Sequence, residues 1–552
     1  MADRIADYII VGGGLTGCVV ASRLKQARPD LDILIVEAGV DPPKRPQTKT
    51  FYEDTAIISS GLHWAYITDP QPNTGLRDHI LHRGKCLGGG TAIGFGGWGR
   101  GDATDYDQWG KAVGDPRWSY KGLLPYFRRS ESFFDPAGDP ELHGFDGPIH
   151  VRPGNGSDDY DRQYPLREPF REAFMETGVP FNRDSCSPAL LGISETLQTW
   201  IRGKRQTAYD GYDLGGVARI TSAEVYRVEF AESHAKRRAC AVALVDGRRF
   251  KARREIILAA GTVGTPRLLM LSGIGPAETL YKHKVPVVVD NWHVGKNHIE
   301  PFCITQLYSL RSHAHGLALG RFADPGTAQM EAFPLDWMIN LDVPLDILET
   351  AAQKDGMSPD TTPDESIRIP GRPLINVMVF YAPIVAPGAP MDGSLVMITT
   401  SLQLPTSRGV VEIRSASPAD PPGINGNYLD TEVDRAALIY GVRRTMQVLL
   451  KTDALMGFIE KEVPPSGLPP LSCESLDDEI EARIRATGVT FFSSSGTASM
   501  GRVVDPDLRV YGVANLRIVD ASIIPVSFCS PPDATLYAVA EQAADIILEG
   551  IR

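Results

Sequence analysis

Apolar and polar positions at the start of the chain follow the order strand, turn, helix, strand. The expected elements are a strand at residues 8–11, a glycine-rich turn at 12–17, a helix at 18–26 and a strand at 32–36. Both strands are short, nearly continuous apolar runs, as in sheets that are buried on both faces. The pattern therefore predicts the opening of a βαβ unit.

Later parts of the chain carry mixed signals. Alternation within residues 219–243 predicts antiparallel strands, and the apolar run at 254–260 predicts a strand ending at Gly261. Strand-like runs at 374–380 and 394–398 precede a helix that Thr431 caps and that extends to about residue 450. The last helix is expected at 533–548, after two prolines. Residues 40–150 are rich in Gly and Pro and predict irregular structure, and 316–366 predict variable loops.

Length and charge limit the classes of protein. The 552 residues are 43% hydrophobic and 22% charged, which is typical of a globular protein and excludes global disorder. A core rarely exceeds about 250–300 residues, so two domains are expected. The net charge of −12 argues against nucleic acid and anionic membranes as partners. No apolar run approaches about 20 residues and no leader pattern is visible, so we expect a cytoplasmic protein whose 7 cysteines are reduced.

A phosphate-binding turn follows the first strand. The stretch Gly12-Gly-Gly14-Leu-Thr-Gly17 fits G-x-G-x-x-G, in which glycines allow a tight turn and close approach of a pyrophosphate to a helix N-terminus. Glu37 lies 20 residues after Gly17 at the end of the second strand, where a carboxylate can accept hydrogen bonds from a ribose. These features predict a dinucleotide site, and they leave NAD and FAD open.

Two longer motifs narrow this choice. The stretches Gly84-Lys-Cys-Leu-Gly-Gly-Gly-Thr-Ala-Ile-Gly94 and Gly261-Thr-Val-Gly-Thr-Pro-Arg-Leu-Leu-Met-Leu-Ser-Gly-Ile-Gly275 resemble the two signatures of the glucose–methanol–choline (GMC) family of FAD oxidoreductases. Other segments similar to that family are residues 63–66, 407–409 and 515–522. The resemblance spans nearly the whole chain in the family's order.

The resemblance implies an α/β fold of two parts. One is a Rossmann-like FAD-binding domain built from residues 1–150, 196–300 and 495–552. The other is a substrate domain, an antiparallel sheet flanked by helices, built from 151–195 and 301–494. Some relatives attach FAD through a His in the first signature, where this chain has Ile93 and Gly94, so non-covalent FAD is expected.

The same resemblance implies the cofactor contacts. Glu37 would hold the ribose and Val225 would contact the adenine, while Asp520 and Ala521 would lie by the pyrophosphate and the ring. The last helix, after Pro531 and Pro532, would direct its positive end at the flavin and favour an anionic reduced form. The pyrophosphate contacts would come from the first turn, at Gly12, Gly14, Leu15, Thr16 and Gly17, and the isoalloxazine contacts from Leu87, Gly89 and Gly94. Ala38 and Ala260 are two further expected cofactor contacts.

The residues that usually remove the substrate's proton are missing. Ser493 and Pro531 stand where the family carries a His and a second His or Asn, and Gly94 replaces an Asn or His of the first signature. All 11 histidines lie at or before His315, so no shift of register restores one. Loss of a positioned base costs about 10²–10⁴-fold in rate. The hydroxyls of Ser493 and Ser494 can bind a substrate oxygen, but they are too weakly basic to ionise it.

Other side chains are candidates for the missing base. Asp533 is the first, although a helix N-terminus would lower its pKa and an ordinary acid at that position is the alternative. His298 and Glu300 could enter the pocket, and Cys529 is either a thiol facing the substrate or a packed small residue. No cluster of residues suggests a metal.

Three functions remain open at this stage. The first is hydride transfer from an alcohol- or phenol-type small molecule, such as a natural-product intermediate, to flavin N5 with a non-standard base. The second is a redox-neutral reaction on the same scaffold, such as that of a lyase, cyclase, isomerase, dehydratase or decarboxylase. The third is a catalytically silent FAD-binding protein.

Overall fold

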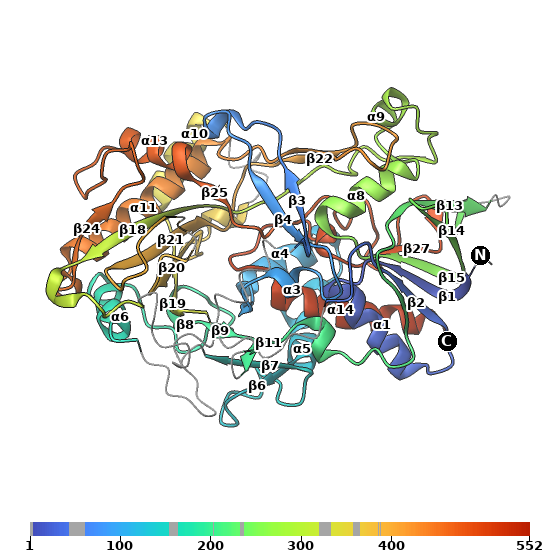
Figure 1. Cartoon of the computed structure of the whole chain (residues 1–552), viewed down its shortest axis with the longest axis horizontal. Helices are drawn as coiled ribbons and strands as arrows, with labels where there is room; N and C mark the ends of the chain where they lie inside the picture. Colours follow the sequence, from blue (N-terminus) through green and yellow to red (C-terminus); the bar gives the residue numbers. More distant parts are fainter. Residues whose placement is uncertain are drawn as a thin grey trace.

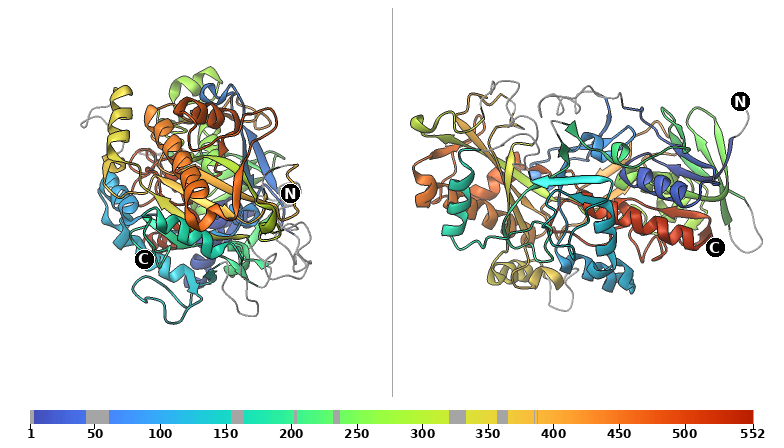
Figure 2. Two further views of the ribbon diagram at one scale, coloured as in Figure 1. Left: turned by 90° about the vertical axis from the view of Figure 1, so that its left-hand side faces the viewer. Right: turned by 90° about the horizontal axis from the view of Figure 1, so that it is seen from below.

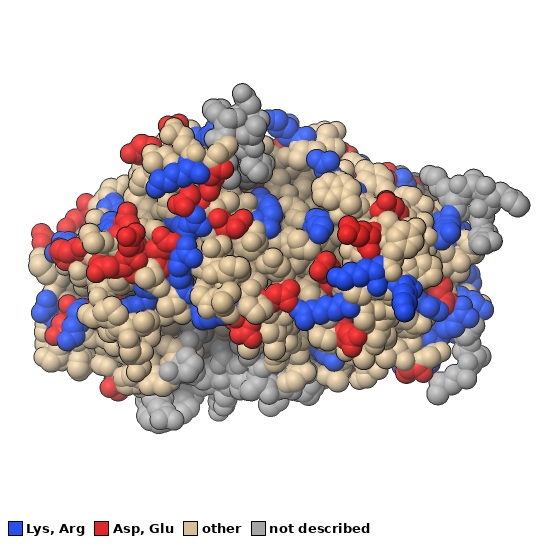
Figure 3. Space-filling model, turned by 90° about the horizontal axis from the view of Figure 1, so that it is seen from above, with Lys and Arg blue, Asp and Glu red and all other residues tan. Residues whose placement is uncertain are grey.

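The computed structural model describes residues 4–42, 61–153, 164–201, 204–231, 237–319, 333–356, 365–384, 386 and 388–551. The molecule is elongated, with one large sheet toward each end and both chain termini at the same end (Figure 1). No helix within these residues is long and apolar enough to cross a membrane. On the face shown in Figure 3, positive and negative side chains are interspersed.

The first sheet has eight strands among the described residues. Its order is β12-β2-β1-β15-β14-β13, and two further short strands pair with β14 and β15. The strands are β1 (Arg4–Val11), β2 (Ile33–Val36), β12 (Ala218–Ile220), β13 (Val225–Ala231), β14 (Arg237–Leu244), β15 (Arg249–Leu258), β26 (Val513–Ala514) and β27 (Leu516–Ile518). β1 pairs in parallel with β2 and β15, so the predicted βαβ unit is confirmed. β13 and β14 are antiparallel, as the alternation predicted.

Helices cover this sheet because its central strands are apolar on both faces. Every residue of β2 is buried, which requires cover on each side. Helix α1 (Leu15–Ala27) lies beside the last helix, α14 (Asp533–Glu549), as the right-hand view of Figure 2 shows. Helix α8 (Gly261–Leu271) follows β15 directly.

The prediction of irregular structure for residues 40–150 is wrong for much of that region. It contains the hairpin β3 (His63–Ile67) and β4 (Ile80–Gly84) and the helices α4 (Ala103–Val113) and α5 (Tyr120–Ser130). Many glycines and prolines lie at the ends of these elements. Gly114, for example, ends α4 in a left-handed conformation at φ 68°, which glycine adopts readily. Residues 43–60 lie outside the described chain.

The second sheet is antiparallel, as expected. Its order is β24-β18-β21-β20-β19-β8, and β25 pairs with β18. The strands are β8 (Gly192–Glu195), β18 (Phe302–Leu310), β19 (Leu335–Leu341), β20 (Ile375–Phe380), β21 (Leu395–Leu402), β24 (Ile459–Val463) and β25 (Val489–Thr490). Helices α11 (Glu432–Lys451) and α13 (Asp477–Thr487) pack against it, and the Thr431 side chain caps α11 as predicted.

The prediction of loops for residues 316–366 is also wrong in part. Strand β19 and helix α10 (Leu345–Lys354) lie within this range. Two buried polar residues, Asp336 and Asn340, interrupt the apolar pattern of β19. Asn340 accepts a hydrogen bond from the Asn376 amide at 3.0 Å, so the strand keeps a polar residue in its interior. Residues 320–332 and 357–364 lie outside the described chain.

The remaining helices and strands of the described chain are short and lie outside the two large sheets. The strands are β5 (Gly97–Trp98), β6 (Glu131–Phe133), β7 (Ile149–Pro153), β9 (Leu197–Gln198), β10 (Trp200–Ile201), β11 (Lys204–Arg205), β16 (Ile274–Gly275), β17 (Val289–Asp290), β22 (Val410–Glu412) and β23 (Gly423–Asn425). The helices are α3 (Gly90–Ile93), α6 (Arg167–Glu176), α7 (Ala208–Gly211), α9 (Ala277–Lys282) and α12 (Asp453–Met456).

Candidate active site

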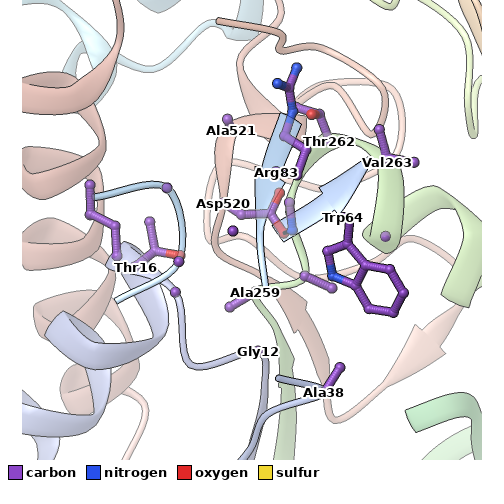
Figure 4. Close-up of a pocket in the computed structure, with 18 of the residues that line it drawn as sticks. Gly12, Thr16, Ala38, Trp64, Arg83, Ala259, Thr262, Val263, Asp520 and Ala521 are labelled. Carbon is purple, nitrogen blue, oxygen red and sulfur yellow. Dashed lines mark hydrogen bonds between the residues drawn. The ribbon is translucent and has the colours of Figure 1, made fainter. Parts of the chain in front are cut away.

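A pocket lies where the carboxyl ends of β1, β2 and β15 meet the N-termini of α1, α8 and α14. Crevices at the carboxyl ends of parallel strands are the usual ligand sites of α/β sheets. Figure 4 shows that residues from α1, from the β3–β4 hairpin, from α8 and from the C-terminal segment surround a common space. The topology of the first sheet therefore creates the site.

Bare backbone forms part of the pocket wall. Gly12 has φ +106°, and a Cβ atom there would lie 2.3 Å from the Ala259 carbonyl oxygen, so only glycine fits. A Cβ added at Gly90 or Gly261 would meet nothing within 4 Å, although both residues line the pocket. A ligand can thus approach the main chain closely at these positions.

Two helices direct uncapped N-termini at this space. Neither Gly14, which precedes α1, nor Pro532, which precedes α14, provides a side-chain cap. The first N–H groups of a helix have no partner within the helix, and its dipole favours negative charge there. The α1 terminus with its glycine turn therefore fits a pyrophosphate, the anionic part of a dinucleotide.

Asp520 binds the N-terminal turn of α8, the third helix that begins at the pocket. Its carboxylate accepts hydrogen bonds from the Gly261 N–H at 2.9 Å and from the Thr265 hydroxyl at 2.6 Å. Burial raises the pKa of Asp520, and these hydrogen bonds oppose that shift. Asp520 and Ala521 both line the pocket, where the sequence placed them.

Glu37, the residue expected to hold the ribose, lines the pocket at the end of β2. One carboxylate oxygen accepts a hydrogen bond from the Gly13 N–H and the other from the Gly39 N–H, both at 2.7 Å. Burial raises the pKa of Glu37 against these two bonds. Each oxygen keeps a free lone pair, so the carboxylate can still accept a ribose hydroxyl.

Most of the predicted site residues line this one pocket. They are Gly12, Gly14, Leu15, Thr16, Glu37, Ala38, Gly89, Val225, Ala260, Ser493, Ser494, Asp520, Ala521, Pro532 and Asp533. Four do not line it: Gly17, Leu87, Gly94 and Pro531. A Cβ at Gly17 would lie 2.1 Å from the Gly12 oxygen, so Gly17 allows close packing of the turn.

The segment that lacks the expected imidazole is held by hydrogen bonds. We call residues 490–495 the serine turn. The Ser493 N–H donates to Glu300 at 3.1 Å and its hydroxyl donates to the Phe491 carbonyl at 3.2 Å. The Ser494 hydroxyl lies 2.7 Å from that of Thr262. Both hydroxyls are hydrogen-bonded within the protein, and among the described residues neither has a carboxylate or an imidazole as its partner.

Sequence reasoning missed several residues of the pocket wall. Arg83, at the end of β4, donates hydrogen bonds to Ser494 and to the Phe492 carbonyl. Trp64 lines the pocket from the paired strand β3 (Figure 4). Arg83 directly precedes the first signature, so its position next to Gly84 was a usable signal.

Asp533 is the unpartnered carboxylate of the pocket. Its side chain is partly buried, lines the pocket and makes no hydrogen bond with any described residue. Burial raises the pKa of Asp533 to about 6. This corrects the expectation that the helix N-terminus would lower it, because loss of water around the carboxylate outweighs the helix dipole.

The other candidate bases lie elsewhere. His298 and Glu300 are buried but do not line the pocket, and burial lowers the pKa of His298 to about 3. Cys529 packs in the interior, where its N–H donates to Asp105 at 2.9 Å, so packing explains its position. No group of three or more metal-ligating side chains occurs in the described parts of the chain.

Comparisons with known proteins agree with this geometry. Sequence profiles of GMC oxidoreductases match residues 6–300 and 405–540. A GMC-type oxidoreductase of Aspergillus aculeatus is 36% identical, with 99% of each chain covered.

Solved structures are similar over the same length. A pyridoxine 4-oxidase from Mesorbium loti has a TM-score of 0.81 at 28% identity, with 98% of each chain covered. A formate oxidase of Aspergillus oryzae, from a study of its FAD modification, has a TM-score of 0.88 at 26% identity, covering 100% of this chain and 99% of that one. The chain belongs to the GMC oxidoreductase family and is an FAD-dependent oxidoreductase.

Proposed function

We propose that this protein oxidises an alcohol- or phenol-type small molecule and that Asp533 accepts the hydroxyl proton. The observation that carries the proposal is the state of Asp533. It is a pocket carboxylate without a hydrogen-bond partner among the described residues, and its pKa is raised to about 6. That value is close to the ordinary imidazole pKa of about 6.5, so Asp533 can do the work of the missing histidine.

The pocket fits the cofactor. The glycine turn and the α1 N-terminus would hold the pyrophosphate, and Glu37 would hold the ribose. When bound, FAD supplies the oxidant, because its flavin can take a hydride from the substrate carbon at N5. Neither Ile93 nor Gly94 can form a bond to the flavin, so we propose that the cofactor is non-covalent.

The protein's own residues provide the proton chemistry. A carboxylate with a pKa of about 6 is mostly ionised at pH 7 and is still basic enough to take a proton as the substrate hydroxyl loses it. Ser493 lines the pocket and can orient the substrate oxygen. The proton therefore passes from the substrate oxygen to an Asp533 carboxylate oxygen.

The relatives indicate which compounds to test. Two similar structures are named for their action on pyridoxine and formate. Pyridoxine carries both an alcohol and a phenol-like hydroxyl, the two groups in our proposal. A panel of pyridoxine, an aryl alcohol, an aliphatic alcohol, a hydroquinone and formate covers both classes and includes one compound, formate, that has neither an alcohol nor a phenol group.

The test is an anaerobic titration of the yellow holoenzyme with this panel, following flavin absorption and product together. The proposal predicts stoichiometric bleaching of the flavin and formation of the oxidised product by a hydroxyl compound. Product formation without bleaching, with no label lost from the substrate carbon, would instead indicate a redox-neutral reaction.

A further inference from the structure

A single arginine places positive charge at the serine turn. Arg83 lines the pocket from β4. One guanidinium nitrogen donates to the Phe492 carbonyl at 3.3 Å, and the other donates to the Ser494 hydroxyl. The cation thus bonds to the turn that lacks the imidazole.

Glu300 anchors this arginine from behind. The carboxylate accepts a hydrogen bond from Arg83 at 3.0 Å, and its side chain is 0% exposed, against 19% for Arg83. Glu300 also accepts hydrogen bonds from the Ser493 N–H and the Thr490 hydroxyl. Arg83 lines the pocket and Glu300 does not, so the pair presents its positive end to the ligand.

Glu300 has one other ion-pair contact among the described residues, and that partner is neutral. His298 Nε2 lies 3.7 Å from the Glu300 carboxylate. Its pKa is lowered to about 3 by burial and by the charge of Arg83, so it carries no charge near pH 7. Within the part of the chain that the structure describes, the charged side chains bonded to the serine turn are Arg83 and Glu300.

The pair also holds an unfavourable backbone conformation. Phe492 has φ +61°, which is uncommon for a residue with a bulky side chain. Arg83 bonds to its carbonyl, and the Thr490 hydroxyl accepts a hydrogen bond from its N–H at 3.2 Å. Such strain persists only where the surroundings fix it.

We propose that Arg83 is a positioning residue that supplies, through the anchor of Glu300, a fixed positive charge at the serine-turn end of this active site. The charge would stabilise the negative charge that the flavin gains on two-electron reduction, while the same contacts hold the serine turn. The inference requires bound FAD but does not depend on which substrate the protein oxidises.

Removing the positive or the negative charge of the pair should shift the flavin midpoint potential in opposite directions. Arg83→Gln removes a positive charge and should lower the equilibrium constant for two-electron flavin reduction at least tenfold, a fall of about 30 mV in the midpoint potential. Glu300→Gln removes the counter-charge, leaves a similar shape and should raise that potential. If the substitutions only disrupted the serine turn, the midpoint potentials of both variants would shift in the same direction.

Two further variants complete the experiment. Arg83→Lys keeps the charge but not the planar fork, so its equilibrium constant for flavin reduction should stay within threefold of the wild-type value. Arg77→Gln is the matched control, because Arg77 joins the same hairpin to the Gly488 carbonyl at 2.7 Å without touching the serine turn. Its potential should not change.

The measurement is the equilibration of each holoenzyme with a reference dye during slow anaerobic reduction, which needs no substrate. Failure of the proposed substrate class would leave this result unaffected. Opposite shifts for Arg83→Gln and Glu300→Gln, with Arg83→Lys near wild type, would support the proposal. Shifts of the same sign, or no shift in Arg83→Gln, would overturn it.

Discussion

At the scale of single residues, the proposed function rests on Asp533. The pKa of its carboxyl is raised to about 6 by burial, so the base becomes active as the pH rises through that value. The sequence identified this residue but gave the wrong direction for its pKa shift. A sequence shows that a carboxylate begins a helix, but not how much of the carboxylate the folded protein buries.

The first prediction is a pH profile. The rate constant for flavin reduction in the wild-type protein should rise with pH and level off above about pH 6 to 7. Asp533→Asn should be slower and should lack this rise below pH 7. Stopped-flow mixing under nitrogen measures both, and an identical profile in the variant would remove Asp533 from the proton transfer.

The raised pKa also affects stability. A carboxyl whose pKa is higher in the folded protein than the unfolded value of about 3.9 destabilises the folded protein when it is ionised. This loss in the free energy of unfolding is absent below about pH 4 and complete above about pH 6. Asp533→Asn should therefore increase the free energy of unfolding of the apoprotein at pH 7 by about 1–3 kcal/mol, and much less at pH 4. Thermal unfolding at the two pH values tests this difference, and an equal gain at both would contradict the shift.

Glu37 provides a third prediction at this scale. Glu37→Ala leaves the buried Gly13 and Gly39 N–H groups unpaired, at about 1–3 kcal/mol each, and removes the expected ribose acceptor. FAD should bind at least tenfold more weakly, as measured by quenching of flavin fluorescence. Glu549→Ala, at the exposed end of α14, is the control. Unchanged affinity in Glu37→Ala would refute the ribose assignment.

At the scale of elements, long apolar patterns and caps could be predicted from the sequence. The βαβ opening, α11 with its Thr431 cap and the last helix all appear where expected. Helix α4 was missed because the glycine that ends it resembles a loop residue, and α5 was missed because Gly122 and Pro125, which are unfavourable in helices, lie within it. Strand β19 was missed because its buried polar residues find their partners in distant segments, Asn340 in β20 and Asp336 at Arg167 of α6.

An element-scale prediction separates cofactor binding from folding. A Cβ at Gly90 would face the pocket and meet no protein atom within 4 Å. Gly90→Ala should therefore fold normally but weaken FAD binding about tenfold. Gly457→Ala, at a site equally open but outside the pocket, should leave affinity unchanged. Equal affinity in both variants would show that the backbone at Gly90 does not approach the ligand.

At the scale of the whole molecule, the site depends on contacts between distant segments. Arg83, Glu300 and Ser494 come from three separate parts of the chain. The positions of the glycine turn and Glu37 were predictable because local motifs mark them. The network around the serine turn was not, because nothing in the local sequence shows which segments meet.

A buried ion pair joins the two halves of the molecule. Arg372, which precedes β20, donates to Asp105 of α4 at 2.6 Å, and both side chains are almost fully buried. Arg372→Ala should destabilise the protein by about 3–5 kcal/mol, because it leaves a buried carboxylate without its partner. Arg443→Ala breaks a more exposed pair with Asp477 and should cost less than about 1 kcal/mol. Similar melting temperatures for the two variants would contradict this ranking.

The central claim is that Asp533 replaces the missing histidine in an FAD-dependent oxidation. Its most direct test is single-turnover flavin reduction at pH 7 in Asp533→Asn, with a substrate that bleaches the wild-type protein. Asp477→Asn, which removes the first acid of α13 outside the pocket, is the matched control. The account predicts a rate constant at least tenfold lower in Asp533→Asn at full FAD content, and no change in the control. Equal rates in all three proteins would contradict it.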